Sequence, residues 1–167
     1  MSKLLEIVNY FPKTDLPLLL SEEVLSDFEV ANDPFPQSFI QTVLNVWEPE
    51  ADEYTEFIPI ASFAKEDKFQ AIVYWKGSLL RYDYILATID ATGVLINKRA
   101  IASTIVKEGL IQKSVASITP DYIINIIAGH SVDGVEYDPA ISKMYSMEVL
   151  ANGYIIFSLE EGMNEFG

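Results

Sequence analysis

The stretch "YDYILATIDATGVLINKRAIA", residues 82–102, decides the fold. Its two halves have a hydrophobic period of two, and the residues Asp90-Ala91-Thr92-Gly93 separate them. A period of two is typical of strands, and a short connection that contains glycine is typical of a hairpin. Because four residues cannot hold a crossover helix, the two strands must be antiparallel.

The same pattern continues on both sides of this hairpin, from residue 57 almost to the end of the chain. Asn152-Gly153, the strongest short hairpin signal, separates "MYSMEVLA" from "YIIFSL". We predict eight strands, at about 57–64, 69–76, 82–90, 94–103, 110–118, 122–129, 143–150 and 154–159. The fold class is therefore mainly β, an eight-stranded antiparallel meander. Its two groups of four strands, 57–103 and 110–159, allow a barrel, a sandwich or two blade-like sheets.

The residues before the meander have a different pattern and predict one or two N-terminal helices. In "QSFIQTVLNVW", residues 37–47, one apolar stripe runs along a helix; it consists of Phe39, Ile40, Val43, Leu44 and Trp47. "SEEVLSDF", residues 21–28, predicts a shorter helix that Ser21 caps. The two prolines of "FPKTDLPLLL", residues 11–20, indicate an extended chain that lies against another part of the protein.

The strand "YIINIIAG", residues 122–129, is apolar on both faces, so both faces of the sheet need cover. We expect the N-terminal helix to lie across one face of the sheet or to close one end. The chain of 167 residues then forms a single domain. It consists of a helical and extended segment at 1–48, an acidic connector at 49–56 and the β-meander at 57–160.

Composition excludes several classes of protein. There is no cysteine, which excludes disulfides, thiolate metal sites and cysteine nucleophiles. The net charge is −14, and residues 1–56 carry 12 acids against only two bases. Such a surface repels nucleic acid and anionic membranes and favours a basic protein if the chain has a charged partner at all. The alternative interpretation is that the charge simply keeps the protein soluble and monomeric.

The first residues, "MSKLLEIVNYFPK", lack the apolar segment of a signal peptide because Glu6 and Asn9 interrupt it. No apolar run approaches the roughly 18 residues that a membrane helix requires. We therefore expect a soluble, cytoplasmic protein that does not insert into membranes, or an envelope or periplasmic protein if a leader has been removed.

The connector itself is the most acidic stretch of the sequence. "WEPEADEYTE", residues 47–56, contains five carboxylates, at Glu48, Glu50, Asp52, Glu53 and Glu56. No glycine lets the stretch fold around a metal ion, and repulsion among the acids favours an extended chain. Two interpretations stay open: a solvated connector between helix and meander, or a docking surface for a basic partner.

The stretch "GHSVDG", residues 129–134, partly matches the Gly-x-Ser-x-Gly turn of serine hydrolases. The match fails because Asp133 replaces the second glycine and because His130, the only histidine, is adjacent to Ser131. The same loop carries a candidate metal set, namely His130, Asp133, Glu136 and Asp138. The alternative is a hairpin loop whose acids face water.

Acids that lie within strands are candidates for a pair of glycosidase carboxylates, and Asp83 and Glu148 are the nearest cases. Such residues more often face solvent on the polar side of their strand. The sequence therefore singles out no catalytic residue and no cofactor, and we expect a protein that is not an enzyme.

The turn pattern resembles that of a group of known sequences. Leu86, Thr88, Asp90 and Gly93 match the strand and Asp-x-x-Gly turn that recur in uncharacterised β-meander proteins of Bacteroidetes-type bacteria. The resemblance implies a β-meander over most of the chain. It brings no assigned activity with it.

Three hypotheses of function follow. The first is a non-enzymatic, acidic protein-binding domain that engages a basic partner, as an inhibitor or an immunity protein against a secreted toxin does. The second is a binder of small apolar ligands in a lumen among the meander strands. The third is an enzyme of a type that the sequence does not reveal.

Overall fold

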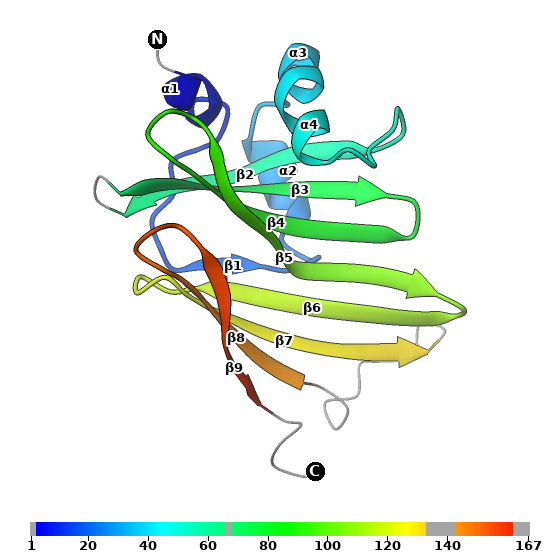
Figure 1. Cartoon of the computed structure of the whole chain (residues 1–167). Coiled ribbons are helices and arrows are strands. Elements are labelled where there is room, and N and C mark those ends of the chain that lie inside the picture. The colour runs from blue at the N-terminus through cyan, green and yellow to red at the C-terminus, as the bar shows by residue number, and fades with distance from the viewer. Residues whose placement is uncertain (1–2, 66–67, 133–142, 162–167) are drawn as a thin grey trace.

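A computed structural model describes residues 3–65, 68–132 and 143–161. In these residues, nine antiparallel strands form one open sheet, and short helices lie on the N-terminal side (Figure 1). The strands are β1 (Leu18–Leu20), β2 (Glu56–Lys65), β3 (Phe69–Ser78), β4 (Arg81–Ile89), β5 (Leu95–Lys107), β6 (Leu110–Ile118), β7 (Ile123–Val132), β8 (Lys143–Val149) and β9 (Ile155–Glu161). Strands β2 to β9 follow one another in the sheet, which confirms the predicted meander.

Local turn chemistry forms the hairpins as the sequence predicted. The Asp90 carboxylate accepts hydrogen bonds from the backbone N–H groups of Thr92 (2.8 Å) and Val94 (3.0 Å). Gly93 has a φ of +86° and Gly153 a φ of +90°, backbone conformations that favour glycine. In these two turns, the residues that identify the turn in the sequence are therefore the ones that stabilise it.

Strand β5 divides the sheet. It pairs with β4 along most of its length but with β6 only through its last residues, from Thr104 to Lys107. Beside β6, the place that β5 leaves is taken by β1, where Leu18 pairs with Ile118 and Leu20 with Ala116. The ninth strand therefore comes from the segment predicted to be extended.

That segment also contacts the other end of the sheet. The Ser62 N–H donates to the carbonyl of Pro12 (2.7 Å), and the Thr14 N–H donates to the carbonyl of Ser62 (2.9 Å). Residues 11–20 thus lie first along β2 and then along β6. The prediction of an extended chain laid against the protein is confirmed.

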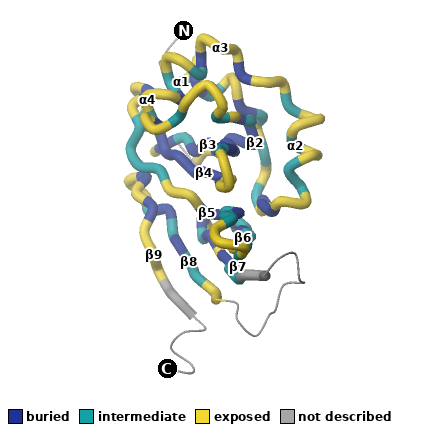
Figure 2. Tube along the Cα trace, turned by 90° about the vertical axis from the view of Figure 1, so that its right-hand side faces the viewer, coloured by how far each residue is buried: buried dark blue, intermediate teal, exposed yellow. Residues whose placement is uncertain are grey.

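The sheet is curled, and its concave face holds the inner core (Figure 2). In Figure 2, β8 and β9 turn up along one side of the stack formed by β4 to β7. The Thr88 hydroxyl of β4 donates to the carbonyl of Gly153 in the β8–β9 turn (2.6 Å). The Tyr122 ring packs edge-on against the rings of Phe63 and Phe69. The two groups of four strands are therefore parts of one curled sheet rather than separate sheets, and they pack against each other across the inner core.

Helices cover the other face of β2 to β4. They are α1 (Lys3–Val8) and the continuous helical segment α3 (Gln37–Phe39), η1 (Ile40–Leu44) and α4 (Asn45–Trp47). Helix α2 (Leu25–Ala31) lies on the concave side instead, where its Leu25 and Phe28 pack against the inner core. Buried Phe39 and Leu44 from the last segment pack with Tyr74 and Ile85 of the sheet in an outer core. The predicted apolar stripe of residues 37–47 is therefore confirmed, and α1 adds buried Ile7 to the same core.

Two details differ from the sequence-based expectation. Helix α2 begins at Leu25, and no side chain caps it. Ser21 is instead buried, and its carbonyl accepts a hydrogen bond from the Tyr84 hydroxyl (2.7 Å). The helices also leave β7 uncovered on its outer face, where Ile127 is 43% exposed, so the expectation of cover on both faces fails there.

Candidate functional site

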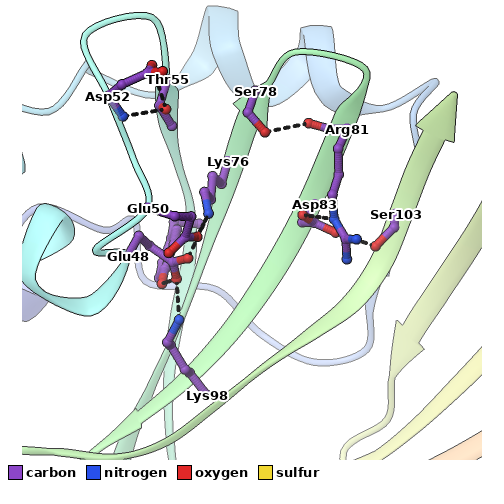
Figure 3. Close-up of polar contacts among 11 residues, drawn as sticks. Glu48, Glu50, Asp52, Thr55, Lys76, Ser78, Arg81, Asp83, Lys98 and Ser103 are labelled. Carbon is purple, nitrogen blue, oxygen red and sulfur yellow. Dashed lines mark hydrogen bonds and ion pairs between the residues drawn. The ribbon is translucent and has the colours of Figure 1, made fainter. Parts of the chain in front are cut away.

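The acidic connector follows α4 and runs beside the β3–β4 hairpin (Figure 3). Glu48, its first acid, is only 3% exposed. Its carboxylate accepts hydrogen bonds from the Tyr74 hydroxyl (2.6 Å) and from the ammonium groups of Lys76 (3.0 Å) and Lys98 (2.7 Å). The expectation that Glu48 is solvated is therefore wrong, because two cations and a phenol satisfy its buried charge. Its part in binding a partner stays a prediction.

Glu50 extends this cluster to the surface. Its side chain is mostly exposed, and it forms a second ion pair with Lys76. The hydrogen bond from Lys76 is the main cause that lowers the pKa of Glu50 to about 2. Burial alone would lower the pKa of Lys76, but hydrogen bonds to Glu50 and Glu48 outweigh it and raise that pKa.

Tyr74 is the uncharged member of the cluster, which we call the Glu48 cluster and define as Glu48, Glu50, Tyr74, Lys76 and Lys98. Burial raises the pKa of Tyr74, and the charge of Glu48 raises it further. Tyr74 therefore stays protonated and donates its hydroxyl hydrogen to Glu48. The cluster ties the connector to β3 and β5.

A local turn orders the rest of the connector. The Asp52 carboxylate accepts hydrogen bonds from the Tyr54 N–H (2.9 Å) and the Thr55 hydroxyl (3.3 Å). The Asp52 N–H in turn donates to the Thr55 hydroxyl (3.0 Å). The connector is therefore a hydrogen-bonded turn that is anchored at Glu48. It is not the extended chain expected from charge repulsion.

The remaining connector acids, Glu50, Asp52, Glu53 and Glu56, are all exposed. Between them Tyr54 is 81% exposed, although a tyrosine usually buries most of its ring. Glu56, the last residue of the connector, pairs with Gly77 near the end of β3. The β3–β4 turn, which follows directly, therefore lies beside the connector. That turn carries Leu79, which is 91% exposed.

The β3–β4 turn is unusual in its chemistry as well as its exposure. Leu80 has a φ of +62°, which glycine or asparagine adopts at much lower cost. It is also exposed, like Leu79 beside it. We name the exposed residues Glu53, Tyr54, Glu56, Leu79 and Leu80 the connector face. From the sequence alone, Tyr54 and both leucines did not stand out as candidates. The signal that could have found the leucines is a Leu-Leu pair where a turn usually has Gly, Asn or Asp.

A charged groove of about 410 Å³ lies next to the Glu48 cluster. Lys76, Lys98, Arg81 and Arg99 line it together with Glu48, Glu50 and Asp83. Asp83 is buried and accepts hydrogen bonds from Arg81 (3.0 Å) and the Ser103 hydroxyl, so the expectation that it faces solvent is wrong. Its contacts are those of an ion pair and a hydrogen bond within the sheet.

The candidate metal set falls mostly in a part of the chain that the structure leaves out. Asp133, Glu136 and Asp138 lie outside the described residues, and the backbone of His130 pairs with Gln112 in the sheet. Within residues 3–65, 68–132 and 143–161, no three His, Asp or Glu side chains gather as metal ligands do. The metal hypothesis for this loop therefore stays a prediction.

Among the described residues, none of the helices has the length and apolar character needed to cross a membrane. No family model matches the chain, and no curated protein or solved structure is significantly similar to it.

Proposed function

We propose that this protein is a non-enzymatic binding domain that engages a basic protein through the connector face. The observation that carries the proposal is the exposure of Tyr54 and Leu79 on ordered turns with acids around them. Buried aromatic and aliphatic anchors within a polar rim are typical of protein interfaces. The carboxylates of Glu53 and Glu56 at this rim favour a partner with Lys or Arg around an apolar depression.

The charge of the whole N-terminal third supports a basic partner. Eleven of the twelve acids in residues 1–56 are exposed, Glu48 being the exception. In contrast, four of the eleven bases of the chain line the charged groove, where carboxylates pair with several of them. A surface that displays its acids and pairs its bases attracts a basic protein over long distances and speeds association.

Preorganisation is the second support. The turn at Asp52 and the anchor at Glu48 hold the connector before any partner arrives. An ordered binding loop loses less conformational entropy on association than a flexible one. Inhibitors and immunity proteins act by occupying a partner's surface, and this role needs no catalytic group.

The alternative of an apolar lumen has less support. Side chains that project into the concave face, such as Leu20, Leu86, Ile118 and Ile124, are fully buried and pack together in the inner core. A ligand there would have to displace packed side chains. Protein binding at the surface requires no such rearrangement.

The test compares two variants that remove the same chemistry from two places. The connector variant carries Glu53→Gln, Tyr54→Ala and Glu56→Gln. The helix variant carries Asp27→Asn, Glu29→Gln and Val30→Ala, and it also loses two exposed acids and one exposed apolar side chain, from α2. Neither set touches a buried residue, so both variants should fold as the wild type does.

Each protein is immobilised and used to capture basic proteins from cells that contain the native chain. We expect wild type and the helix variant to retain the same basic partner and the connector variant to release it. Leu79→Ala should weaken retention as well. A partner that the connector variant holds as firmly as wild type does would contradict the proposal.

A further inference from the structure

A second hollow lies on the other face of β3 and β4, away from the Glu48 cluster. It has a volume of about 270 Å³ and lies between α2 and strands β3 to β6. Its lining includes Trp75, Tyr82 and Tyr84 from the sheet and Glu22 and Leu25 from the segment around the start of α2. We call it the aromatic pocket. The connector face contributes no residue to it.

The aromatic walls are fixed in place by the protein itself. The rings of Trp75 and Tyr82 are stacked, with centroids 5.6 Å apart and planes 13° apart. A Cβ atom at Gly77 would come within 2.3 Å of the Trp75 ring, so glycine is what lets this ring lie where it does. The Tyr84 hydroxyl is held by its hydrogen bond to the carbonyl of Ser21. The pocket is therefore formed before any ligand enters.

The charge of the lining is one-sided. Of the described residues that line it, Glu22 is the one that carries a charge. Lys113 pairs with Glu22 at 2.6 Å, but both side chains are nearly half exposed. An ion pair in contact with water contributes little, so Glu22 can exchange Lys113 for another cation at small cost.

The effect of nearby carboxylates on Tyr84 also favours a cation in the pocket. Burial raises the pKa of Tyr84, and the charges of Glu23 and Glu22 raise it further. Both carboxylates therefore act on Tyr84, and of the two Glu22 lines the pocket. Aromatic faces attract cations through their quadrupoles, and the attraction grows where water is excluded.

We infer that the aromatic pocket binds an organic cation, a substituted ammonium or guanidinium group, between the Trp75–Tyr82 stack, Tyr84 and the carboxylate of Glu22. Tyr82 is 37% exposed and forms the accessible wall, while Trp75 lies behind it. A neutral apolar group of the same shape would gain the contacts with the rings but neither the cation–π attraction nor the ion pair. The inference stands independently of the proposed protein partner.

The test uses choline and its neutral carbon isostere, dimethylbutanol, as probes, together with the amide of arginine. Binding is followed by two-dimensional NMR, in which the Trp75 indole resonance reports the pocket and the Trp47 indole serves as an internal reference. We expect saturable shifts at Trp75 with both cations and affinity for choline at least tenfold higher than for the isostere. A stronger response to arginine amide would identify guanidinium as the preferred head group.

Variants locate the site. Tyr82→Ala should weaken choline binding about tenfold, Tyr82→Phe should retain it, and Glu22→Gln should weaken it severalfold. Tyr154→Ala removes another exposed tyrosine, next to the β8–β9 turn, and should leave binding unchanged. Equal binding of choline and its isostere, a Tyr82→Ala variant that binds as wild type does, or no saturable shift with either cation would overturn the inference.

Discussion

Glu48 shows at the scale of a single residue how this protein uses charge. It begins the most acidic stretch of the chain, yet it is the acid of residues 1–56 that is buried. Removing a buried charge from its partners is costly because the remaining charges lose their compensation. The pairing of Glu48 with Lys76 and Lys98 therefore fixes the connector on the sheet.

The variant Glu48→Gln tests this role. It keeps the shape of the side chain but leaves Lys98 without an acid, while Lys76 retains Glu50. We expect the free energy of unfolding to fall by about 2–3 kcal/mol, between the values for exposed and fully buried pairs. Thermal unfolding should show a decrease in Tm of roughly 5–10 °C for a domain of this size.

The matched control is Glu53→Gln, which neutralises an exposed acid of the same connector. It should change the free energy of unfolding by less than about 0.5 kcal/mol. If Glu48→Gln and this control had the same Tm, the Glu48 cluster would not anchor the connector.

Glu50 gives the protein a defined dependence on pH. Its pKa in the folded protein is about 2, below the ordinary value of 4.5. The main cause of this lowering is the hydrogen bond from Lys76. A carboxyl whose pKa is lowered by folding stabilises the folded state above its ordinary pKa and loses that effect as the pH falls toward the lowered value. The contribution of Glu50 should therefore be full near neutral pH and vanish between about pH 4.5 and pH 2.

Urea denaturation of wild type and Glu50→Gln at several pH values measures this contribution. The wild type should be more stable at pH 7, and the difference should shrink through that acidic range. A difference that stays constant from pH 7 to pH 2 would show that Glu50 does not pair with Lys76 in solution.

Sequence separation explains why these residue contacts could not be predicted. The turn at Asp90 forms within five residues, so its chemistry is visible in the sequence. Glu48 meets Tyr74 26 residues later and Lys98 50 residues later. Neither partner is marked by any local pattern, so Glu48 looked like its exposed neighbours.

At the scale of elements, the hydrophobic period predicted those strands and helices that depend on one segment and its neighbours in sequence. All eight meander strands and the helix at 37–47 form near the predicted residues. Strand β1 could not be predicted, because its three residues become a strand only where β5 departs from β6. Helix α1 was missed as well, since it is a short segment whose Ile7 is buried only by tertiary packing.

Strand β1 offers a matched pair of adjacent leucines. Leu20 is fully buried in the inner core, whereas Leu19 points outward and is exposed. We expect Leu20→Ala to lower the free energy of unfolding by about 2–4 kcal/mol, through lost burial and the cavity left behind. Leu19→Ala should cost less than about 0.5 kcal/mol.

Urea unfolding of the two variants measures both values under the same conditions. Equal costs would mean that β1 does not insert its side chains into the core. A small cost at both positions would indicate that β6 folds without pairing with β1.

At the scale of the whole molecule, the fold separates two kinds of charge. The exposed acids of residues 1–56 face water, and the bases of the charged groove are gathered against carboxylates on the sheet. Between these regions the connector face displays Tyr54 and Leu79. The acidic third was visible in the sequence, and a basic partner was an expectation drawn from it; only the structure shows that exposed Tyr54 and Leu79 lie near these acids.

The central claim, that the connector face binds a basic protein, is tested most directly by the affinity of the captured partner as a function of salt concentration. Calorimetric titrations would compare wild type, the connector variant and the helix variant. The claim predicts that affinity for wild type falls steeply with salt, that the connector variant binds more weakly with a shallower slope, and that the helix variant keeps tight binding. A connector variant with the affinity and the salt dependence of wild type would contradict it.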